Sequence, residues 1–170
     1  MVGIIDGVML TDAAVGHREI LALLDKGVKV IGGGSMGALR AAELSDFGML
    51  GIGTIYEEYA SGRVEGDDEV VLSYDPFSLV PLSEPLINIR LNLRKARLER
   101  VISGTSESLL LSEMRKVFYP HRNFQLLIEM ARKNLDAAEA RKLIKFVEEG
   151  VEDFKKNDAL FLLKGVKEMV

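Results

Sequence analysis

The chain has no cysteine, and this absence excludes several classes of fold and site. Without a thiol there can be no disulfide scaffold, zinc ribbon, iron–sulfur site or cysteine nucleophile. The absence also gives no sign of an oxidising compartment. Any nucleophilic chemistry must therefore use an atom other than sulfur.

Long apolar runs and an excess of positive charge are missing as well. The opening segment MVGIIDG lacks the basic region and the long apolar stretch of a signal peptide. No segment approaches the roughly 20 apolar residues of a membrane span, so we expect a cytoplasmic protein that does not enter a membrane. The 22 Lys and Arg residues are outnumbered by 26 Asp and Glu residues, which gives a net charge of −4. This balance argues against nucleic-acid binding through the whole surface.

What the chain does have is enough apolar material for a folded core. Of its 170 residues, 48% are hydrophobic and 28% are charged, which excludes global disorder. The length is typical of one domain. We expect a single domain over 1–170, with an α/β part over about 1–80 and a helical part over about 81–170.

The first third of the chain alternates strand and helix signals. Two short apolar strands joined by a helix favour a parallel, right-handed unit. A glycine-rich stretch then breaks the pattern, before a further helix and a third strand. The predicted elements are a strand at 2–6, a helix from about 12 to 25, a strand at 28–32, a helix from about 36 to 46, the glycine-rich stretch 49–54, a helix at 55–63 and a strand at 67–74.

The second half of the chain is predicted to form four or five helices. Ser83 before Pro85 indicates a helix start, Asp136 indicates another, and Gly150 indicates an end. The segment 87–94 alternates with period two, which is typical of a strand, but the flanking signals favour a helix. The fold class is therefore α/β, with a small parallel β-α-β layer in the N-terminal half and a helical C-terminal half.

The most informative segment joins the second predicted strand to the helix after it. It contains a run of glycines and one serine, and two motifs overlap in it. Gly32, Gly34 and Gly37 satisfy GxGxxG, while Gly33, Ser35 and Gly37 satisfy GxSxG.

The first motif is typical of dinucleotide binding. Its glycines let the backbone approach a pyrophosphate at the helix N-terminus, and an acidic residue about 20 positions later should end the next strand. Glu57 and Glu58 have this spacing but fall in a predicted helix. The strand that should carry them is missing, so the motif supports this interpretation weakly.

The second motif is typical of a serine nucleophile. A tight strand-to-helix turn would lift Ser35 out of the layer, and the N–H of Met36 would be a candidate oxyanion donor. Ser35 could instead be an N-cap on a glycine turn. The residues alone leave catalysis, phosphate binding and capping open.

A serine nucleophile needs a base, and two basic residues are predicted to lie on apolar helical faces. His17 shares a face with Ile20 and is expected to point inward, either as a base or as a hydrogen-bonded core histidine. Lys155 lies in an apolar stripe with Leu162, and Asp158 follows three residues later. Burial lowers the pKa of a lysine and can make it a usable base, whereas simple pairing with Asp158 is the alternative.

Other charged residues are open to two interpretations. Arg40 and Glu43 share a face of the helix after Ser35, where they could orient a substrate or form a surface ion pair. The sequence also has a basic run and a separate group of acidic residues. This separation of charge is typical of either a solvated face or a surface that docks to protein partners. No cluster has metal-ligand spacing. The basic run is Arg90, Arg94, Lys95, Arg97 and Arg100, and the acidic residues are Glu57, Glu58, Glu65, Asp67, Asp68 and Glu69.

Several segments together resemble the TfuA-like protein family. The most specific is SMGALRAAEL, and the resemblance covers almost the whole chain. The segments are IIDG (4–7), HREI (17–20), GGSMGALRAAEL (33–44), FGMLGIG (47–53), DDEV (67–70) and LSEPLINIR (82–90), with Asp153, Lys155, Asp158 and Ala159 matching more loosely.

The resemblance implies a role beside YcaO enzymes, which convert a peptide amide to a thioamide in peptide natural products and in methyl-coenzyme M reductase of methanogens. It implies that the chain hydrolyses a thiocarboxylated, ThiS-type carrier protein with a Ser–Lys pair and releases sulfide for the YcaO partner. Carried over to this sequence, the pair is Ser35 and Lys155. Arg18 stands where many relatives carry lysine, and arginine cannot serve as the base, so the base stays open between Lys155 and another residue.

The expected site therefore has three groups of residues and a defined set of partners. The partners are a YcaO enzyme, a ThiS-type carrier and a peptide or protein substrate, with no cofactor, metal, nucleic acid or membrane. Two other functions stay open: a non-catalytic adaptor for YcaO and its substrate, and a nucleotide- or phosphate-binding protein. The catalytic pair is Ser35 and Lys155, the oxyanion loop is Gly33, Gly34, Met36 and Gly37, and the supporting or substrate-binding residues are Asp6, His17, Arg40, Glu43 and Asp158.

Overall fold

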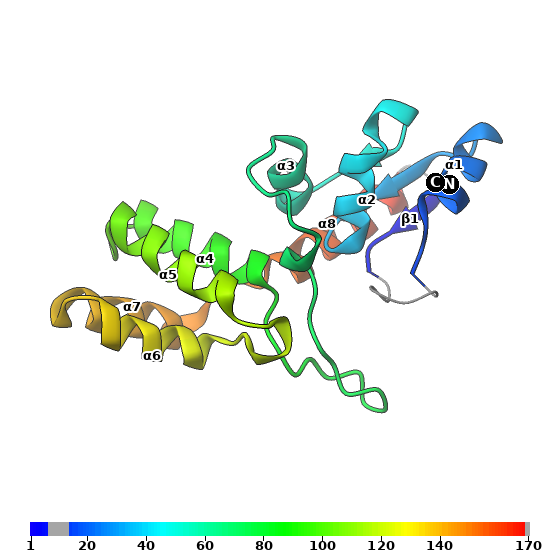
Figure 1. Ribbon diagram of the computed structural model, residues 1–170. Coiled ribbons are helices and arrows are strands. Elements are labelled where there is room, and N and C mark those ends of the chain that lie inside the picture. Colours follow the sequence, from blue (N-terminus) through cyan, green and yellow to red (C-terminus); the bar gives the residue numbers. More distant parts are fainter. Residues whose placement is uncertain (7–13, 169–170) are drawn as a thin grey trace. The chain divides into compact units, whose positions relative to one another are not determined.

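The computed structural model describes residues 1–6 and 14–168 (Figure 1). It divides the chain into two compact units. The first combines Met1–Asp67 with Asp153–Val170, and the second is Asp68–Glu152. The two ends of the chain therefore build one unit, and the middle of the chain builds the other.

A small parallel sheet organises the first unit. The described residues contain the strands β1 (Val2–Ile4), β2 (Val30–Gly32) and β3 (Leu50–Gly51), in the order β1-β2-β3. Both neighbouring pairs are parallel, with Val2 opposite Val30 and Ile31 opposite Leu50. The α/β class with a parallel N-terminal layer is confirmed.

The third strand is not where the sequence indicated. The prediction of a strand at 67–74 is wrong, because Asp67–Glu69 forms a 3₁₀ turn, η2, and Tyr74 makes only an isolated bridge to Pro81. The observed third strand lies inside the glycine-rich stretch 49–54. Two residues of strand carry no readable alternation, so this strand left no pattern in the sequence.

Four α-helices surround this sheet within the described residues of the first unit. They are α1 (His17–Asp25), α2 (Met36–Glu43), α3 (Thr54–Ala60) and α8 (Phe154–Glu168), and a 3₁₀ turn, η1 (Ser45–Phe47), follows α2. The first helix begins later than predicted, because Ala14–Gly16 are not helical. Its predicted start at residue 12, and Gly7 of the IIDG segment, lie outside the described residues.

The core of the first unit forms where the helices meet the sheet. Met36 and Ala41 of α2 pack with Ile4 of β1 and Val30 of β2. Helix α8 packs against β1 and α3, and Leu162 of α8 is fully buried. The last helix thus belongs with the sheet, although its helical pattern had grouped it with the C-terminal half.

The second unit is helical. Its helices are α4 (Leu86–Leu98), α5 (Gly104–Lys116), α6 (Phe124–Asn134) and α7 (Ala137–Gly150), with a 3₁₀ turn, η3 (Tyr119–His121), before α6. Together with α8 they match the four or five helices predicted for the second half. The segment 87–94 is helical as expected, and its period-two alternation reflects a helix that is buried on nearly all sides. The core includes Leu86, Ile89, Leu93, Leu110, Leu127 and Leu143.

The predicted helix boundaries of this unit are mostly confirmed. Asp136 caps α7 by accepting hydrogen bonds from the N–H groups of Ala138 and Glu139, and Gly150, with φ of 123°, ends it. The helix start indicated by Ser83 and Pro85 is that of α4, but Ser83 does not cap this helix. Its buried hydroxyl instead accepts a hydrogen bond from the N–H of Ser73, at 2.8 Å.

The basic run 90–100 is not simply a solvated face. Arg90 is buried, and its guanidinium binds both carboxylate oxygens of Glu69, which is also buried. The Arg122 guanidinium donates to the carboxylate of Asp68, at 2.7 Å. Buried charges need such partners, so Arg90 of the basic run and Glu69 of the acidic segment neutralise each other inside this unit.

Among the helices of the described chain, none has the length and apolarity to cross a membrane.

Candidate functional site

The glycine turn between β2 and α2 is held in place by close backbone contacts. A Cβ atom at Gly37 would collide with the carbonyl oxygen of Ile4, and one at Gly32 would collide with the carbonyl oxygen of Gly37. A Cβ at Gly33 would lie 2.6 Å from the carbonyl oxygen of Ile52. These positions therefore accept only glycine without a backbone shift. The start of α2 rests directly on the end of β1.

The same turn touches the last helix. Gly34 has φ of +79°, which favours glycine. Its Cβ position lies 3.3 Å from the carbonyl oxygen of Lys155 and 3.3 Å from the backbone nitrogen of Ala159. The turn before Ser35, the end of β1 and the first turns of α8 thus meet in one place.

Ser35 occupies the N-cap position of α2, but its hydroxyl does not cap the helix. The residue is only 1% exposed, and its Oγ has no hydrogen-bond partner among the described residues. Ser35 is therefore closed off from solvent, because the glycines allow β1 and α8 to pack around the turn. A buried hydroxyl without a partner costs about 1–3 kcal/mol, and such groups call for an explanation.

Some of the backbone N–H groups of the turn already donate hydrogen bonds. The N–H of Gly33 donates to Ile4, that of Ser35 donates to Gly33, and that of Gly37 donates to Ile5. Within the described chain, no hydrogen bond engages the N–H groups of Gly34 and Met36. The N–H groups on either side of Ser35 thus have no acceptor among the described residues, whereas the other N–H groups of the turn are already bonded.

Lys155 points inward, as its place in the apolar stripe predicted. Its side chain is 11% exposed, and its Nζ lies 3.5 Å from Oδ2 of Asp6. Asp6 lies two residues after the end of β1 and is exposed. The structure thus brings Asp6, the Ser35 turn and the first turn of α8 together within the first unit.

Asp158 has a role that the sequence did not reveal. Its carboxylate is 5% exposed and accepts hydrogen bonds from the N–H groups of Thr54 and Ile55, at 3.0 and 2.8 Å. These are the first residues of α3, so Asp158 caps that helix across about a hundred positions of sequence. Burial raises the pKa of the Asp158 carboxyl, although its hydrogen bonds from Ile55 and Thr54 act in the opposite direction.

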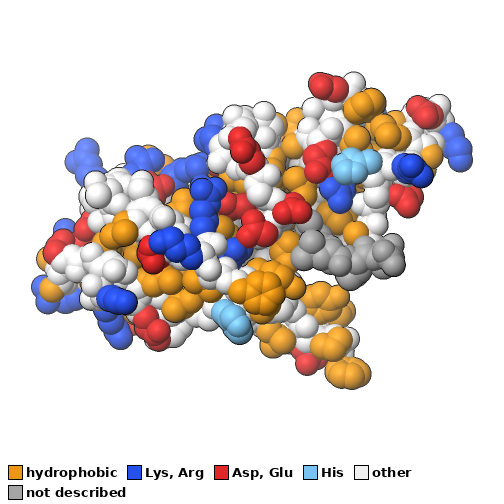
Figure 2. Space-filling view, in the orientation of Figure 1, with side chains coloured by type: hydrophobic (Ala, Val, Ile, Leu, Met, Phe, Trp, Pro, Cys, Tyr) orange, Lys and Arg blue, Asp and Glu red, His pale blue; other side chains and the backbone are white. Residues whose placement is uncertain are grey.

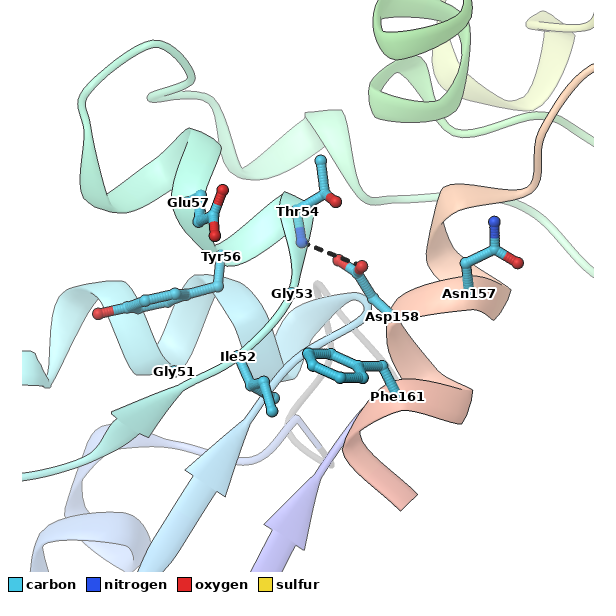
Figure 3. Close-up of a pocket in the computed structure, with 9 residues that line it drawn as sticks. All are labelled: Gly51, Ile52, Gly53, Thr54, Tyr56, Glu57, Asn157, Asp158 and Phe161. Atoms are coloured by element: carbon cyan, nitrogen blue, oxygen red, sulfur yellow. Dashed lines mark hydrogen bonds between the residues drawn. The ribbon is translucent and has the colours of Figure 1, made fainter. Parts of the chain in front are cut away.

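A cavity of about 510 Å³ opens beside this cap (Figure 3). Figure 3 shows Asp158 reaching from α8 to the start of α3, with Phe161 on the same helix. A Cβ at Gly53 would lie 2.5 Å from the carboxylate carbon of Asp158, so only glycine fits there. No local signal could have found this cavity, because its wall joins two distant segments. The lining residues are Gly51, Ile52, Gly53, Thr54, Tyr56, Glu57, Asn157, Asp158 and Phe161.

His17 does not face inward, so that expectation was wrong. It is the first residue of α1, and its side chain is 48% exposed. Its Nε2 lies 2.9 Å from Oε2 of Glu43, and Nη1 of Arg40 lies 2.6 Å from the same oxygen. The Nε–H of Arg40 also donates to the carbonyl oxygen of Val15, at 3.1 Å. The ion-pair interpretation of Arg40 and Glu43 is confirmed, and the three side chains form one cluster on α1 and α2.

The acidic residues required by the dinucleotide interpretation are placed elsewhere. Glu58 is buried on α3, where its Oε1 accepts a hydrogen bond from Nε of Arg63, at 2.9 Å. Glu57 is exposed on the same helix. Neither residue ends a strand next to the glycine turn. Among the residues that the structure describes, no group of three or more His, Cys, Asp or Glu side chains could hold a metal ion.

The family model for TfuA-like proteins matches residues 6–123, which is more than two thirds of the chain. The chain belongs to the TfuA-like protein family. Family membership associates it with peptide thioamidation. The matched residues include the Ser35 turn and end before Lys155, so the family model covers the serine and does not cover the lysine. A search of curated proteins gave no match.

Proposed function

We propose that this TfuA-like protein hydrolyses the C-terminal thiocarboxylate of a ThiS-type carrier protein and releases sulfide for a YcaO enzyme. The observation that carries the proposal is the Ser35 hydroxyl, which is buried and has no hydrogen-bond partner among the described residues. It stands at a strand-to-helix turn, beside two amides that no described acceptor uses. Family membership supports the association with thioamidation.

In the first step, Oγ of Ser35 attacks the thiocarboxylate carbon. Lys155 makes no hydrogen bond to Ser35 in the free protein, so it accepts the serine proton only after the bound carrier tail has brought the two side chains together. The N–H groups of Met36 and Gly34 hold the negative charge that develops on oxygen. The carbon–sulfur bond then breaks and hydrosulfide leaves. The product is an ester between Ser35 and the carrier's C-terminus.

In the second step, water attacks the ester carbon and Lys155 again handles the proton. The carbon–oxygen bond to Ser35 breaks, which restores the hydroxyl and releases the carrier with an ordinary carboxylate. The net reaction consumes one water and exchanges sulfur for oxygen on the carrier. It therefore needs no oxidant, reductant or nucleotide.

The supporting residues act at different distances from this chemistry. Asp6 lies 3.5 Å from the Lys155 amine and holds it in place. Asp158 is a positioning residue, because it fixes α8, which carries Lys155, to α3. The cluster of His17, Arg40 and Glu43 would contact the carrier from the surface.

Access to Ser35 is part of the proposal. Because the hydroxyl is buried, the carrier's tail must displace the atoms that cover it before attack can occur. Enzymes commonly exclude water in this way until the correct substrate is bound. A small serine-directed reagent should therefore label Ser35 slowly without the carrier.

The test is sulfide release from a thiocarboxylated ThiS-type carrier, measured for the wild type and for Ser35→Ala and Lys155→Ala. Exposed neighbours give matched controls, namely Ser45→Ala and Lys156→Ala. We expect the two site variants to lose at least about 100-fold in rate and the two controls to keep it. Normal release by Ser35→Ala would refute the proposal. No release by the wild type, with YcaO binding intact, would favour the non-catalytic adaptor.

A further inference from the structure

The second unit carries a hairpin whose apolar side chains face solvent. Residues 73–83, here called the apolar hairpin, lie between η2 and α4 and project from the helices of their unit (Figure 1). Tyr74 and Pro81 form its antiparallel bridge. Figure 2 shows apolar side chains gathered on this projecting segment. The exposed residues include Tyr74, Phe77, Leu79, Val80 and Leu82, and Phe77 is 95% exposed.

Hydrogen bonds fix the shape of the apolar hairpin. The carboxylate of Asp75 accepts from the N–H groups of Phe77 and Ser78, at 3.0 and 2.7 Å. The N–H of Asp75 donates to Val80, and that of Leu79 donates back to Asp75. The bonds from Ser78 and Phe77 lower the pKa of the Asp75 carboxyl. The apolar side chains are thus presented on an ordered turn.

Leu79 shows that this order has a cost. Its φ of 59° lies in the left-handed region, where a leucine is strained. Its side chain is 70% exposed, so burial against this chain does not offset the strain. Strained residues held by their surroundings cluster at ligand clamps and other functional segments. A hairpin shaped in this way is suited to contact another molecule.

The charge around the apolar hairpin identifies the kind of partner. Between Arg63 and Arg90 the sequence has no lysine or arginine. Of the acidic residues there, Asp68 and Glu69 pair with arginines inside the second unit. Two others, Asp75 and Glu84, lie in or next to the apolar hairpin. Binding to an anionic lipid surface or to nucleic acid relies on Lys and Arg. The complementary surface is therefore a protein cleft with an apolar floor and a basic rim. A rigid aromatic anchor loses little entropy on binding and commonly dominates an interface.

We propose that the apolar hairpin docks this chain to its thioamidating partner enzyme, with Phe77 and Leu79 inserted into an apolar cleft that has a basic rim. This inference rests on the proposed function for the identity of the partner. It separates docking from catalysis, because the hairpin belongs to the second unit and the Ser35 turn belongs to the first.

The test measures binding of the YcaO enzyme to the full chain by calorimetry or surface plasmon resonance. Phe77→Ser should weaken the Kd on the order of 30-fold, as expected for a central aromatic anchor. Leu79→Asn removes the apolar side chain and introduces a residue type that tolerates the left-handed region. It should therefore weaken binding without unfolding the turn. Asp75→Ala keeps every apolar side chain but loses the hydrogen bonds that the carboxylate accepts from Phe77 and Ser78, and should also weaken binding.

Two controls separate docking from folding and from catalysis. Phe47→Ser removes an exposed phenylalanine outside the hairpin and should leave the Kd unchanged. Sulfide release from the carrier alone should be unchanged in Phe77→Ser and Leu79→Asn. Normal release together with weakened YcaO binding is the expected result.

Each other outcome overturns the inference in a recognisable way. Equal YcaO binding by the wild type and the hairpin variants refutes the docking role and leaves the hydrolase proposal intact. No YcaO binding by the wild type refutes the partner in both proposals. If Phe77→Ser instead abolishes binding to lipid vesicles, or abolishes self-association in light scattering, the occupant is a membrane or a second copy of this chain and the inference is wrong.

Discussion

The three residues at the centre of the proposed mechanism, Ser35, Lys155 and Asp6, lie in different environments. The serine is buried without a described partner, while the lysine amine and the Asp6 carboxylate are 3.5 Å apart. This ion pair fixes the position of the Lys155 amine, which accepts a proton in the proposed mechanism.

The ion pair gives a prediction for Asp6→Asn. The amide keeps the size of the side chain but removes the charge that holds the Lys155 amine. We expect the rate of sulfide release to fall on the order of 10-fold, because the amine is positioned less well. Asp46→Asn, which removes an exposed carboxylate on η1, is the matched control. An unchanged rate in Asp6→Asn would show that this contact does not position Lys155.

At the scale of elements, the start of α2 depends on its glycines. A Cβ at Gly37 would collide with the backbone of β1, so Gly37→Ala should destabilise the protein by about 3 kcal/mol. Gly104→Ala is the control, because the nearest atom to its Cβ is 3.6 Å away on the Arg97 side chain. That variant should change stability by less than about 1 kcal/mol. Equal midpoints for the two variants in urea denaturation would contradict this description of the turn.

The contact between α8 and α3 predicts a pH-dependent stability. The folded pKa of Asp158 lies above its ordinary value of 3.8, so between the two values the folded chain keeps a proton that the unfolded chain has released. The free energy of unfolding therefore falls as pH rises through this window. Asp158→Asn cannot titrate and should lack this component.

The measurement is urea denaturation of the wild type and Asp158→Asn at several pH values from acid to neutral. We expect the stability advantage of the wild type over the variant to shrink as pH rises. A difference that is constant, or that grows, would mean that the carboxylate's hydrogen bonds outweigh its burial.

Sequence reasoning succeeded where a signal was local and failed where it was not. The cap at Asp136, the end at Gly150 and the inward side of Lys155 all follow from a few neighbouring residues. The short strand at Leu50–Gly51 and the cap from Asp158 depend on contacts between distant segments. His17 was misplaced because its helix was expected to begin at residue 12, which would have made His17 an interior position.

At the scale of the whole molecule, the two ends of the chain form one unit, and the proposed site draws on both. Ser35 belongs to the N-terminal segment and Lys155 to the C-terminal segment of the same unit. The sequence pattern grouped α8 with the other helices, because the pattern of a helix does not indicate which core the helix packs against. The sheet has only short strands, so α8 supplies part of its cover.

Removal of α8 should therefore affect one unit selectively. A chain that ends at Glu152 loses the buried Leu162 and the cap from Asp158. We expect hydrogen exchange to show lost protection in β1, β2 and α3, with protection retained in α4–α7. Retained protection in β2 would contradict the role of α8 in the first unit.

The central claim is that Ser35 becomes covalently attached to the carrier during sulfide release. The most direct measurement is mass spectrometry of an acid-quenched reaction between the protein and the thiocarboxylated carrier. The account predicts an adduct whose mass is the sum of the two proteins minus hydrogen sulfide, mapped to the peptide that contains Ser35 and absent from Ser35→Ala. Steady sulfide release with no adduct in the wild type, and with an unchanged rate in Ser35→Ala, would contradict it.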